Sequence, residues 1–252
     1  MNARFDGKVA LISGAGSGIG RHTARALAAE GAIVVVAGRR AEPLRETVKL
    51  IEADGGTASL ITGDVADASD SERFVAETVR LHGGLHVAVN NAGVFVGGPV
   101  TDADLDQWNR ALNTNVTGTL LALRHQVRHM SAHGGGTIVN VGSTLGAHAS
   151  FPGLALYGAT KAAVSALSKA AAVEHIGDGV RINVVSPGSS DTPMSMRPGE
   201  DVAGRADRVA STVPLGRIGS LDEVTSAILW MASADSGFAV GHDLVIDGGV
   251  SL

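Results

Sequence analysis

Cysteine is absent from the 252 residues of this chain. Disulfides, thiol nucleophiles and thiolate metal sites are therefore excluded. Neither sign of charge dominates, because 20 Lys and Arg stand against 25 Asp and Glu for a formal net charge of -5, and the basic residues are scattered. This charge pattern is unsuited to binding a phosphate backbone, so we expect no nucleic-acid partner.

Long apolar runs are also missing. No stretch is long enough to span a bilayer, and residues 1–8 lack the apolar region of a signal peptide. We therefore expect a cytoplasmic protein without membrane attachment. Aromatic residues make up only 3% of the chain, with one tyrosine, whereas hydrophobic residues reach 44%. That apolar content is enough for one large core, and no Pro/Gly/Ser-rich linker divides residues 1–252, so we predict a single domain.

Short β-branched runs alternate with longer helical patterns along most of the sequence. The runs predict strands at residues 9–12, 33–37, 58–61, 85–90, 137–141, 181–185 and 244–246. The helical patterns predict helices at 22–31, 42–54 and 69–82, with longer ones around 105–130 and 157–176. Continuous apolar strands separated by helices indicate a parallel sheet covered on both faces. Right-handed crossovers then favour an α/β fold with a doubly wound, Rossmann-like sheet.

A glycine cluster follows the first predicted strand directly and reads Ser13-Gly14-Ala15-Gly16-Ser17-Gly18-Ile19-Gly20. A strand, a glycine turn and a helix N-terminus together form an anion site, because backbone N–H groups and the positive end of the helix dipole face the anion. No lysine follows with Walker spacing, and the G-x-G-x-x-G spacing also fails. The pattern that fits is Gly14-x-x-x-Gly18-x-Gly20. A tight strand-to-helix turn without a ligand is the alternative interpretation.

The end of the second predicted strand carries no acidic residue. In dinucleotide folds an acid at this position holds the adenosine ribose and repels a 2′-phosphate. Here the sequence has Arg39 and Arg40. A guanidinium at Arg39 can form charged hydrogen bonds to a 2′-phosphate, each contributing roughly 1.5–3 kcal/mol. The sequence therefore favours NADP(H) over NAD(H); otherwise both arginines are solvated loop residues, which suits Arg40 better.

Several further motifs occur in one order along the chain, and together they resemble those of the short-chain dehydrogenase/reductase family. The glycine pattern is similar to the family's T-G-x-x-x-G-x-G, with Ser13 in place of threonine. The remaining matches are Asp64-Val65, Asn90-Asn91-Ala92-Gly93, Asn115, Ser143, Tyr157-x-x-x-Lys161, Pro187-Gly188 with Thr192, and Asp247-Gly248-Gly249. The resemblance covers nearly the whole length and implies a single-domain oxidoreductase.

The resemblance also assigns expected roles. The cofactor would be bound by Gly14, Ser17, Gly18, Ile19, Gly20, Arg39, Asp64, Val65, Asn91, Ala92, Gly93, Tyr157, Lys161, Pro187, Gly188 and Thr192. In the family, Asp64-Val65 corresponds to the adenine contact and Pro187-Gly188 with Thr192 to the carboxamide contact. The implied catalytic residues are Ser143, which holds the substrate oxygen, Tyr157 as acid/base, Lys161, and Asn115, which anchors a water that relays protons from Lys161.

The spacing of Tyr157 and Lys161 suits proton transfer. A tyrosine with a pKa near 10 is a poor base at neutral pH. Residues four apart share a helix face, and an ammonium at about 4 Å in an effective dielectric near 20 stabilises a phenolate by roughly 4 kcal/mol. That energy corresponds to lowering the tyrosine pKa by about 3 units. We therefore expect Lys161 to depress the pKa of Tyr157.

Other chemistries are less well supported. The G-x-S-x-G elbow that would indicate a serine hydrolase is absent, and His148 belongs to the expected substrate loop. His125 and His129 are four apart but lack a third ligand and an acid, so we expect a surface pair and no metal. A catalytically idle dinucleotide-binding protein would show a broken Tyr–Lys pair or a missing serine, and neither is seen.

Substrate identity depends on two variable segments, residues 144–156 and a lid at about 189–214. The stretch from Ser143 to Tyr157 is one residue longer than is common in the family. Ser190 and Asp191 stand where the family has apolar residues, which weakens the assignment of Thr192. Apolar side chains suggest a partly apolar pocket: Phe95, Leu145 and Phe151. The lid arginines are either solvated or hold an acidic substrate: Arg197, Arg205 and Arg208.

The sequence thus predicts an NADP(H)-dependent ketone reductase or secondary-alcohol dehydrogenase, with carbonyl reduction as the expected cellular direction. The alternative is an NAD(H)-dependent dehydrogenase of a sugar, polyol or cyclic diol. Two helices, around residues 105–130 and 157–176, combine length with alanine-rich or apolar faces. In the family such helices pair across a two-fold axis, and the resemblance implies a homotetramer.

Overall fold

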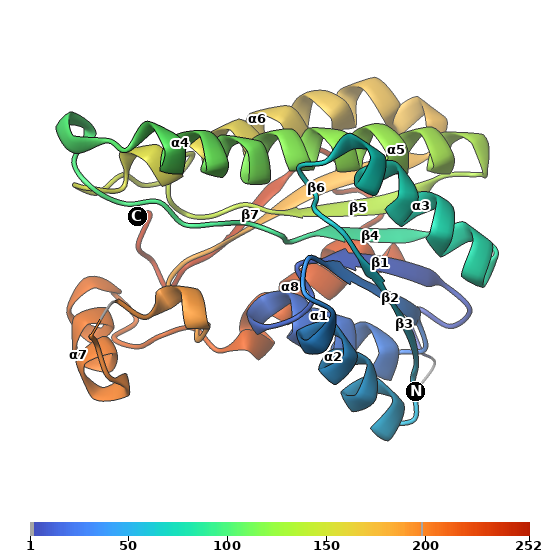
Figure 1. Ribbon diagram of the computed structural model, residues 1–252, viewed down its shortest axis with the longest axis horizontal. Helices are drawn as coiled ribbons and strands as arrows, with labels where there is room; N and C mark the ends of the chain where they lie inside the picture. Colours follow the sequence, from blue (N-terminus) through green and yellow to red (C-terminus); the bar gives the residue numbers. More distant parts are fainter. Residues whose placement is uncertain (1–2, 198) are drawn as a thin grey trace.

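Seven parallel strands form one sheet in the order β3-β2-β1-β4-β5-β6-β7 (Figure 1). The computed structural model describes residues 3–197 and 199–252, so position 198 of the predicted lid lies outside the described residues. The strands are β1 (Val9–Ser13), β2 (Ile33–Gly38), β3 (Thr57–Thr62), β4 (Val87–Asn90), β5 (Gly136–Val141), β6 (Val180–Pro187) and β7 (Asp243–Ile246). The predicted doubly wound parallel sheet is confirmed.

Helices cover both faces of this sheet (Figure 1). One face carries α1 (Gly18–Ala29), α2 (Ala41–Ala53) and α8 (Leu221–Ala232), and the other carries α3 (Ala68–His82), α5 (Gly118–Ala132) and α6 (Ala155–His175). Among the described residues, no helix combines the length and apolar character needed to cross a bilayer.

Shorter elements complete the fold. α4 (Leu105–Ala111) runs through a π-helical turn (Leu112–Thr117) into α5, so the long helix expected around 105–130 is interrupted near its middle. α7 (Val202–Thr212), within the predicted lid, stands apart from the sheet (Figure 1). Short 3₁₀ turns lie at Val100–Asp102, Ile176–Asp178, Pro193–Ser195 and Ala234–Ser236.

The core is divided into two layers by the sheet. Neighbouring residues of one strand belong to opposite layers: Leu11 packs in the layer on the α3 and α5 side, and Ile12 packs in the layer on the α1 and α8 side. The same alternation places Val34 and Val35 in different layers. Because both faces are covered, the positions from Val9 to Ile12 in β1 and from Ile33 to Ala37 in β2 are all apolar, which explains the continuous runs in the sequence.

The strand order reverses between β1 and β4, since β1 bonds β2 on one side and β4 on the other. All seven strands are parallel, so the segments that follow β1, β2, β4, β5 and β6 emerge at one edge of the sheet. In open α/β sheets, ligands bind outside the carboxyl ends of the strands at such a reversal. The predicted site residues belong to these segments and to the one after β3, which carries Asp64 and Val65.

Candidate active site

The glycine turn after β1 is shaped for close approach. Gly14 has a φ of +67°, and a Cβ there would lie 2.8 Å from the Ala92 Cα. A Cβ on Gly20 would lie 2.5 Å from the Gly14 carbonyl oxygen. No side chain caps the N-terminus of α1, where Ser17 is the capping residue. The turn therefore leaves a cradle in front of the helix N-terminus that suits a diphosphate.

The segment after β4 is bound to the same turn. Asn91 donates from Nδ2 to the carbonyl oxygens of Ser13 (3.1 Å) and Gly14 (3.2 Å). The Ser13 hydroxyl accepts from the backbone N–H groups of Asn91 and Ala92, both at 3.2 Å. Ser13 thus joins β1 to the segment after β4, a role that the glycine pattern alone does not reveal.

Arg39 and Arg40 follow β2 with exposed side chains. Within residues 3–197 and 199–252, neither guanidinium has a hydrogen-bond or ion-pair partner, whereas Arg21 and Arg25 on α1 are both paired with carboxylates. Charged groups left unpaired at the edge that carries the cradle are available to an anionic ligand.

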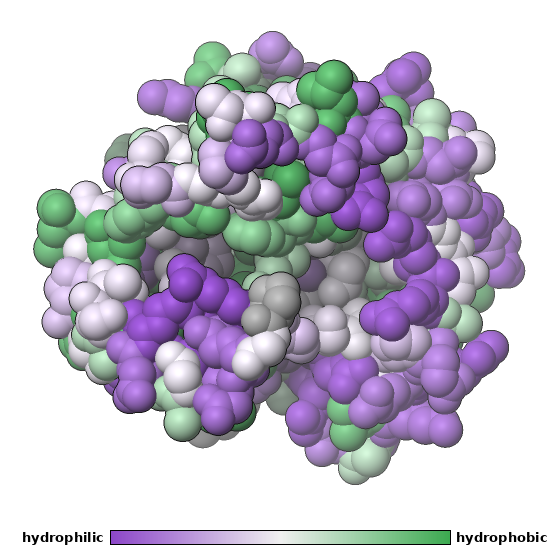
Figure 2. All heavy atoms as spheres, turned by 60° about the vertical axis from the view of Figure 1, so that its left-hand side comes forward, coloured by the Kyte–Doolittle hydropathy of each residue, from purple (hydrophilic) through white to green (hydrophobic). Residues whose placement is uncertain are grey.

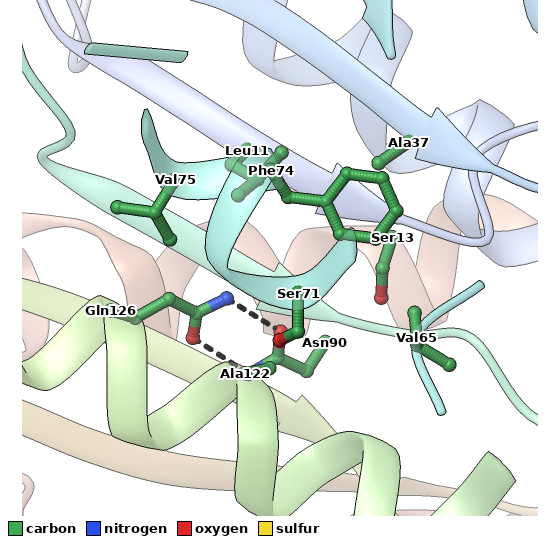
Figure 3. A pocket seen from close by; sticks show the side chains of 10 residues that line it. All are labelled: Leu11, Ser13, Ala37, Val65, Ser71, Phe74, Val75, Asn90, Ala122 and Gln126. Atoms are coloured by element: carbon green, nitrogen blue, oxygen red, sulfur yellow. Dashed lines mark hydrogen bonds between the residues drawn. The ribbon is translucent and has the colours of Figure 1, made fainter. Parts of the chain in front are cut away.

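Asp64 and Val65 follow β3. The Asp64 N–H donates to Asp70 Oδ2 (2.8 Å), and Asp64 Oδ1 accepts from the Ala66 N–H (3.0 Å), which fixes the turn. Val65 lines a small pocket together with Phe74 (Figure 3). Its other lining residues are Leu11, Ser13, Ala37, Ser71, Val75, Asn90, Ala122 and Gln126, of which Asn90 and Gln126 exchange two hydrogen bonds of 2.9 and 2.8 Å.

Ser143, Tyr157 and Lys161 are brought together and buried. Tyr157 and Lys161 lie one turn apart on α6, and Lys161 Nζ is 5.8 Å from the centre of the tyrosine ring. The ammonium also donates to the Val141 carbonyl oxygen at the end of β5 (2.8 Å). The predicted grouping of serine, tyrosine and lysine therefore exists at the carboxyl edge of the sheet.

The pKa of Tyr157 differs from the prediction. Burial raises the pKa of Tyr157 to about 12, and its hydrogen bond with Ser143 offsets only part of that rise. Burial also lowers the pKa of Lys161 to about 8. The expected depression of the tyrosine pKa was wrong for the protein by itself, because desolvation of the phenolate is the largest effect on that pKa. The protein alone holds Tyr157 protonated.

Asn115 lies in the π-helical turn and is buried. Its Nδ2 donates to the Val94 carbonyl oxygen and to Thr160 Oγ1, both at 2.9 Å, and its Oδ1 accepts from the Val94 N–H at 2.8 Å. The side chain thus ties the segment after β4 to α6. A Cβ on Gly93 would lie 3.3 Å from Asn115 Oδ1 and 3.6 Å from Lys161 Nζ, so glycine leaves space between these two polar atoms.

The loop that begins at Ser143 lies next to both ends of β7. Thr144 donates from Oγ1 to Asp247 Oδ2 (2.6 Å), just beyond β7. His148 places Nε2 3.0 Å from Asp243 Oδ2 at the start of the same strand, although no hydrogen-bond geometry is met there. Asp247 therefore holds the base of this loop, a role that sequence reasoning missed.

The segment after β6 lies over the glycine turn. A Cβ on Gly18 would lie 3.3 Å from Thr192 Cγ2. Two of the three arginines in the predicted lid differ from both alternatives that the sequence left open: Arg205 is ion-paired with Asp191 (2.7 Å) and Arg208 with Glu200 (2.7 Å). These two guanidinium groups are therefore not free to hold an acidic substrate, whereas Arg197 is exposed, as the solvated alternative expects.

Apolar side chains border the approach to Tyr157. The Phe95 ring centre lies 5.2 Å from that of Tyr157, and Phe95 is still 46% exposed. Phe151 and Met194 are also exposed. Figure 2 shows hydrophobic surface around a hollow on this side of the molecule, with hydrophilic residues beside it. The opening therefore suits an organic ligand with apolar surface.

The histidines of α5 make no comparable site. His129 stacks on His133 with ring centres 4.1 Å apart, and His133 Nδ1 lies 2.7 Å from the His129 carbonyl oxygen. In the part of the chain that the structure describes, no three His, Cys, Asp or Glu side chains are grouped as metal ligands.

A phosphate cradle at the sheet reversal, next to a buried Ser–Tyr–Lys group, defines a nicotinamide-dependent oxidoreductase that acts on CH–OH or C=O groups. The family profile described as enoyl-(acyl carrier protein) reductase matches residues 14–251. The chain belongs to the short-chain dehydrogenase/reductase family, whose members bind NAD(P).

Three similar proteins illustrate the family. A 2,5-dichloro-2,5-cyclohexadiene-1,4-diol dehydrogenase from Sphingobium indicum is 37% identical over 254 residues, covering 100% of this chain and 99% of that protein. A cyclohexanol dehydrogenase from an Acinetobacter species is 36% identical over 251 residues, covering 98% and 96%. A short-chain dehydrogenase from Burkholderia cenocepacia, solved in complex with NADP, superposes with a TM-score of 0.90 at 33% identity, covering 99% of this chain and 100% of the other.

Proposed function

We propose that this protein interconverts a ring-borne secondary alcohol and its ketone with NADP(H). The observation that carries the proposal is the placement of buried Tyr157 and Ser143 beside the exposed ring of Phe95. A carbonyl oxygen between the two hydroxyls would leave the rest of the substrate against apolar surface. A sugar or polyol would place hydroxyl groups there without partners, at a cost of about 1–3 kcal/mol for each unsatisfied group.

The cofactor assignment follows the polar groups at the carboxyl edge. The diphosphate would be held by the turn from Gly14 to Gly20, and the ribose of the nicotinamide half by Tyr157 and Lys161. The adenine would contact Asp64 and Val65, and the segment from Asn91 to Gly93 would line the site. The carboxamide end would contact Pro187, Gly188 and Thr192. Arg39, unpaired and exposed at the end of β2, would bind the 2′-phosphate, which favours NADP(H) over NAD(H).

The bound dinucleotide supplies or accepts the hydride. During ketone reduction, Tyr157 donates its phenolic proton to the carbonyl oxygen, and Ser143 donates a hydrogen bond to the same oxygen. A tyrosine that burial keeps protonated is already in the correct state for this direction. For alcohol oxidation it must first lose that proton.

Reprotonation of Tyr157 requires a path to solvent. Lys161 lies one turn away and has a pKa of about 8, so its ammonium can give up a proton near neutral pH. The space beside Gly93, between Lys161 Nζ and Asn115 Oδ1, would hold a water that carries the proton onward. Asn115 thereby serves the relay as well as tying α6 to the segment after β4.

The test is a substrate and cofactor panel followed by nicotinamide absorbance. Cyclohexanone and substituted cyclohexanones with NADPH are compared with cyclohexanol and NADP, and with glucose and a polyol in the oxidative direction. We expect turnover with the ring ketones. The Tyr157→Phe variant should lose that turnover while it binds NADPH nearly as well. Faster turnover of the polyol than of the ring compounds, or an active Tyr157→Phe variant, would contradict the proposal.

We also propose a homotetramer. Exposed apolar side chains lie on the outer helices, among them Leu105 on α4, Leu120 on α5 and Val173 on α6. Pairing of these helices between two copies would cover them. Light scattering during gel filtration measures the mass directly, and a 25.4 kDa species would contradict the assembly.

A further inference from the structure

An ion pair crosses the lid between Asp191 and Arg205, with Arg205 Nη2 donating to Asp191 Oδ1 at 2.7 Å. Asp191 directly follows a bridge between Ser190 and Gly219, and Arg205 lies on α7. Arg205 is only 8% exposed and is one of the two buried residues of that helix, the other being Val209. A guanidinium at a buried helix position indicates that α7 docks through a charged contact as well as an apolar one.

The Arg205 guanidinium also contacts the turn that lies between Asp191 and α7. Arg205 Nη1 donates to Ser195 Oγ (3.1 Å) and lies 3.5 Å from the Thr192 carbonyl oxygen. These atoms bound the 3₁₀ turn Pro193–Ser195. One side chain therefore links α7 to Asp191 before the turn and to both ends of the turn itself. If Arg205 releases Asp191, its guanidinium keeps only uncharged partners, Ser195 Oγ at 3.1 Å and the Thr192 carbonyl oxygen at 3.5 Å, so α7 holds the turn less firmly.

The turn covers the place where a dinucleotide enters. Thr192 Cγ2 lies 3.3 Å from the point where Gly18 would carry a Cβ, so the start of the turn closes over the N-terminus of α1. A diphosphate in that cradle would be shielded from solvent by Thr192 and the residues after it. Its departure requires that this segment move.

We propose that the Asp191–Arg205 pair is a latch that sets how long the dinucleotide stays bound, with Arg205 as a positioning residue that acts through Thr192. The latch explains why an acid occupies position 191, where the family resemblance leads one to expect an apolar residue. Without Asp191, a buried guanidinium would lose its charged partner. The inference rests on dinucleotide binding and is independent of the substrate.

A second ion pair in the lid provides a matched control. Arg208 donates from Nε and Nη2 to the two oxygens of Glu200 at 2.7 and 2.8 Å, and from Nη2 to the Ser195 carbonyl oxygen at 3.0 Å. This pair joins α7 to Glu200 just before it, and Arg208 also contacts the end of the turn at Ser195, but neither residue contacts Asp191 or Thr192. Losing it should loosen the lid without releasing the covering turn from α7.

The experiment measures release of NADPH from the full-length protein without substrate, by stopped-flow fluorescence after mixing with excess NADP. Asp191→Asn keeps the size of the side chain and removes its charge. Because Asp191 is 59% exposed and water screens the pair, we expect release about fivefold faster, not hundredfold, with association unchanged. Glu200→Gln should change release by less than about twofold. Arg205→Lys, which keeps the charge but loses the forked geometry, should lie between Asp191→Asn and the unmodified protein.

The salt dependence of NADPH release distinguishes loss of the ion pair from a general loosening of the lid. Added salt should speed release from the unmodified protein and from Glu200→Gln, and should have a smaller effect on Asp191→Asn, where the pair is already broken. Equal acceleration by Asp191→Asn and Glu200→Gln, or an unchanged release rate in Asp191→Asn with an unchanged melting temperature, would overturn the latch. If the protein binds NADH and not NADPH, the cofactor proposal fails, and the same measurement with NADH still tests the latch.

Discussion

Gly146 and Gly158 are in direct backbone contact, because a Cβ on Gly146 would lie 2.1 Å from the Gly158 carbonyl oxygen. Gly158 follows Tyr157 on α6, and Gly146 lies three residues after Ser143. The contact therefore sets the separation of the two hydroxyls that would hold the substrate oxygen. Sub-ångström displacement of such groups weakens catalysis strongly.

Gly146→Ala should cost activity more than stability. A methyl group there must push the loop away from α6, and we expect kcat to fall by about a hundredfold. Gly153→Ala is the matched control, since Gly153 has a φ of +76° and its nearest contact for a Cβ is at 4.0 Å, whereas Gly146 has a φ of +107°. Both variants pay for a positive φ, about 1–2 kcal/mol by thermal or urea unfolding; Gly146→Ala loses further stability through the clash with the Gly158 carbonyl oxygen, and only it should lose turnover. Equal kcat values for the two variants would show that the contact does not set the site.

Lys161→Met should change how stability depends on pH. The pKa of Lys161 falls from 10.5 in the unfolded chain to about 8 in the folded protein, so between these pH values the unfolded chain binds the extra proton and stability rises with pH. The unmodified protein should gain roughly 2–3 kcal/mol of unfolding free energy between pH 7 and pH 10 relative to Lys161→Met.

Urea titrations at several pH values measure this difference, and Lys169→Met, which replaces an exposed lysine on the same helix, is the control. Parallel pH profiles for Lys161→Met and the unmodified protein would mean that Lys161 is not desolvated. Measurements stay below pH 10, the pKa of tyrosine in the unfolded chain. Above that pH the unfolded chain loses the Tyr157 proton while the folded protein, with a pKa raised to about 12, keeps it, so stability falls.

Arg39→Ala should separate the two nicotinamide cofactors. Loss of one charged hydrogen-bonding group to the 2′-phosphate should raise the KM for NADPH by about ten- to hundredfold and leave the KM for NADH unchanged. Arg40→Ala is the neighbouring control and should have a small effect on both. Steady-state kinetics with each cofactor measure the ratio. An unchanged ratio in Arg39→Ala would remove the reason to prefer NADP(H).

The sequence alone predicted the features that depend on a local pattern of residues. Continuous apolar strands predicted the sheet, and the spacing of Gly14, Gly18 and Gly20 predicted the turn. The first helix was placed too late, because glycines at Gly18 and Gly20 suggested a loop where the chain already begins α1. Tyr157 and Lys161 were found because one helical turn separates them.

Contacts between distant residues left no such pattern. Thr144 and Asp247 are 103 residues apart, and Arg205 meets Asp191 only when α7 folds back over the lid. The prediction of the Tyr157 pKa was wrong for a related reason. The spacing of two residues on a helix gives the distance to an ammonium, whereas desolvation depends on everything packed around the ring.

The bond from Thr144 to Asp247 has a consequence for synthesis on the ribosome. The glycine turn, Tyr157 and Lys161 are all translated well before β7. The loop that carries Ser143 is bonded to β6 through the Thr144 N–H and the Pro187 carbonyl oxygen (3.0 Å), but its bond to Asp247 can form only when β7 has emerged and joined the edge of the sheet. A nascent chain stalled before β7 would therefore lack one of the two attachments that hold Thr144.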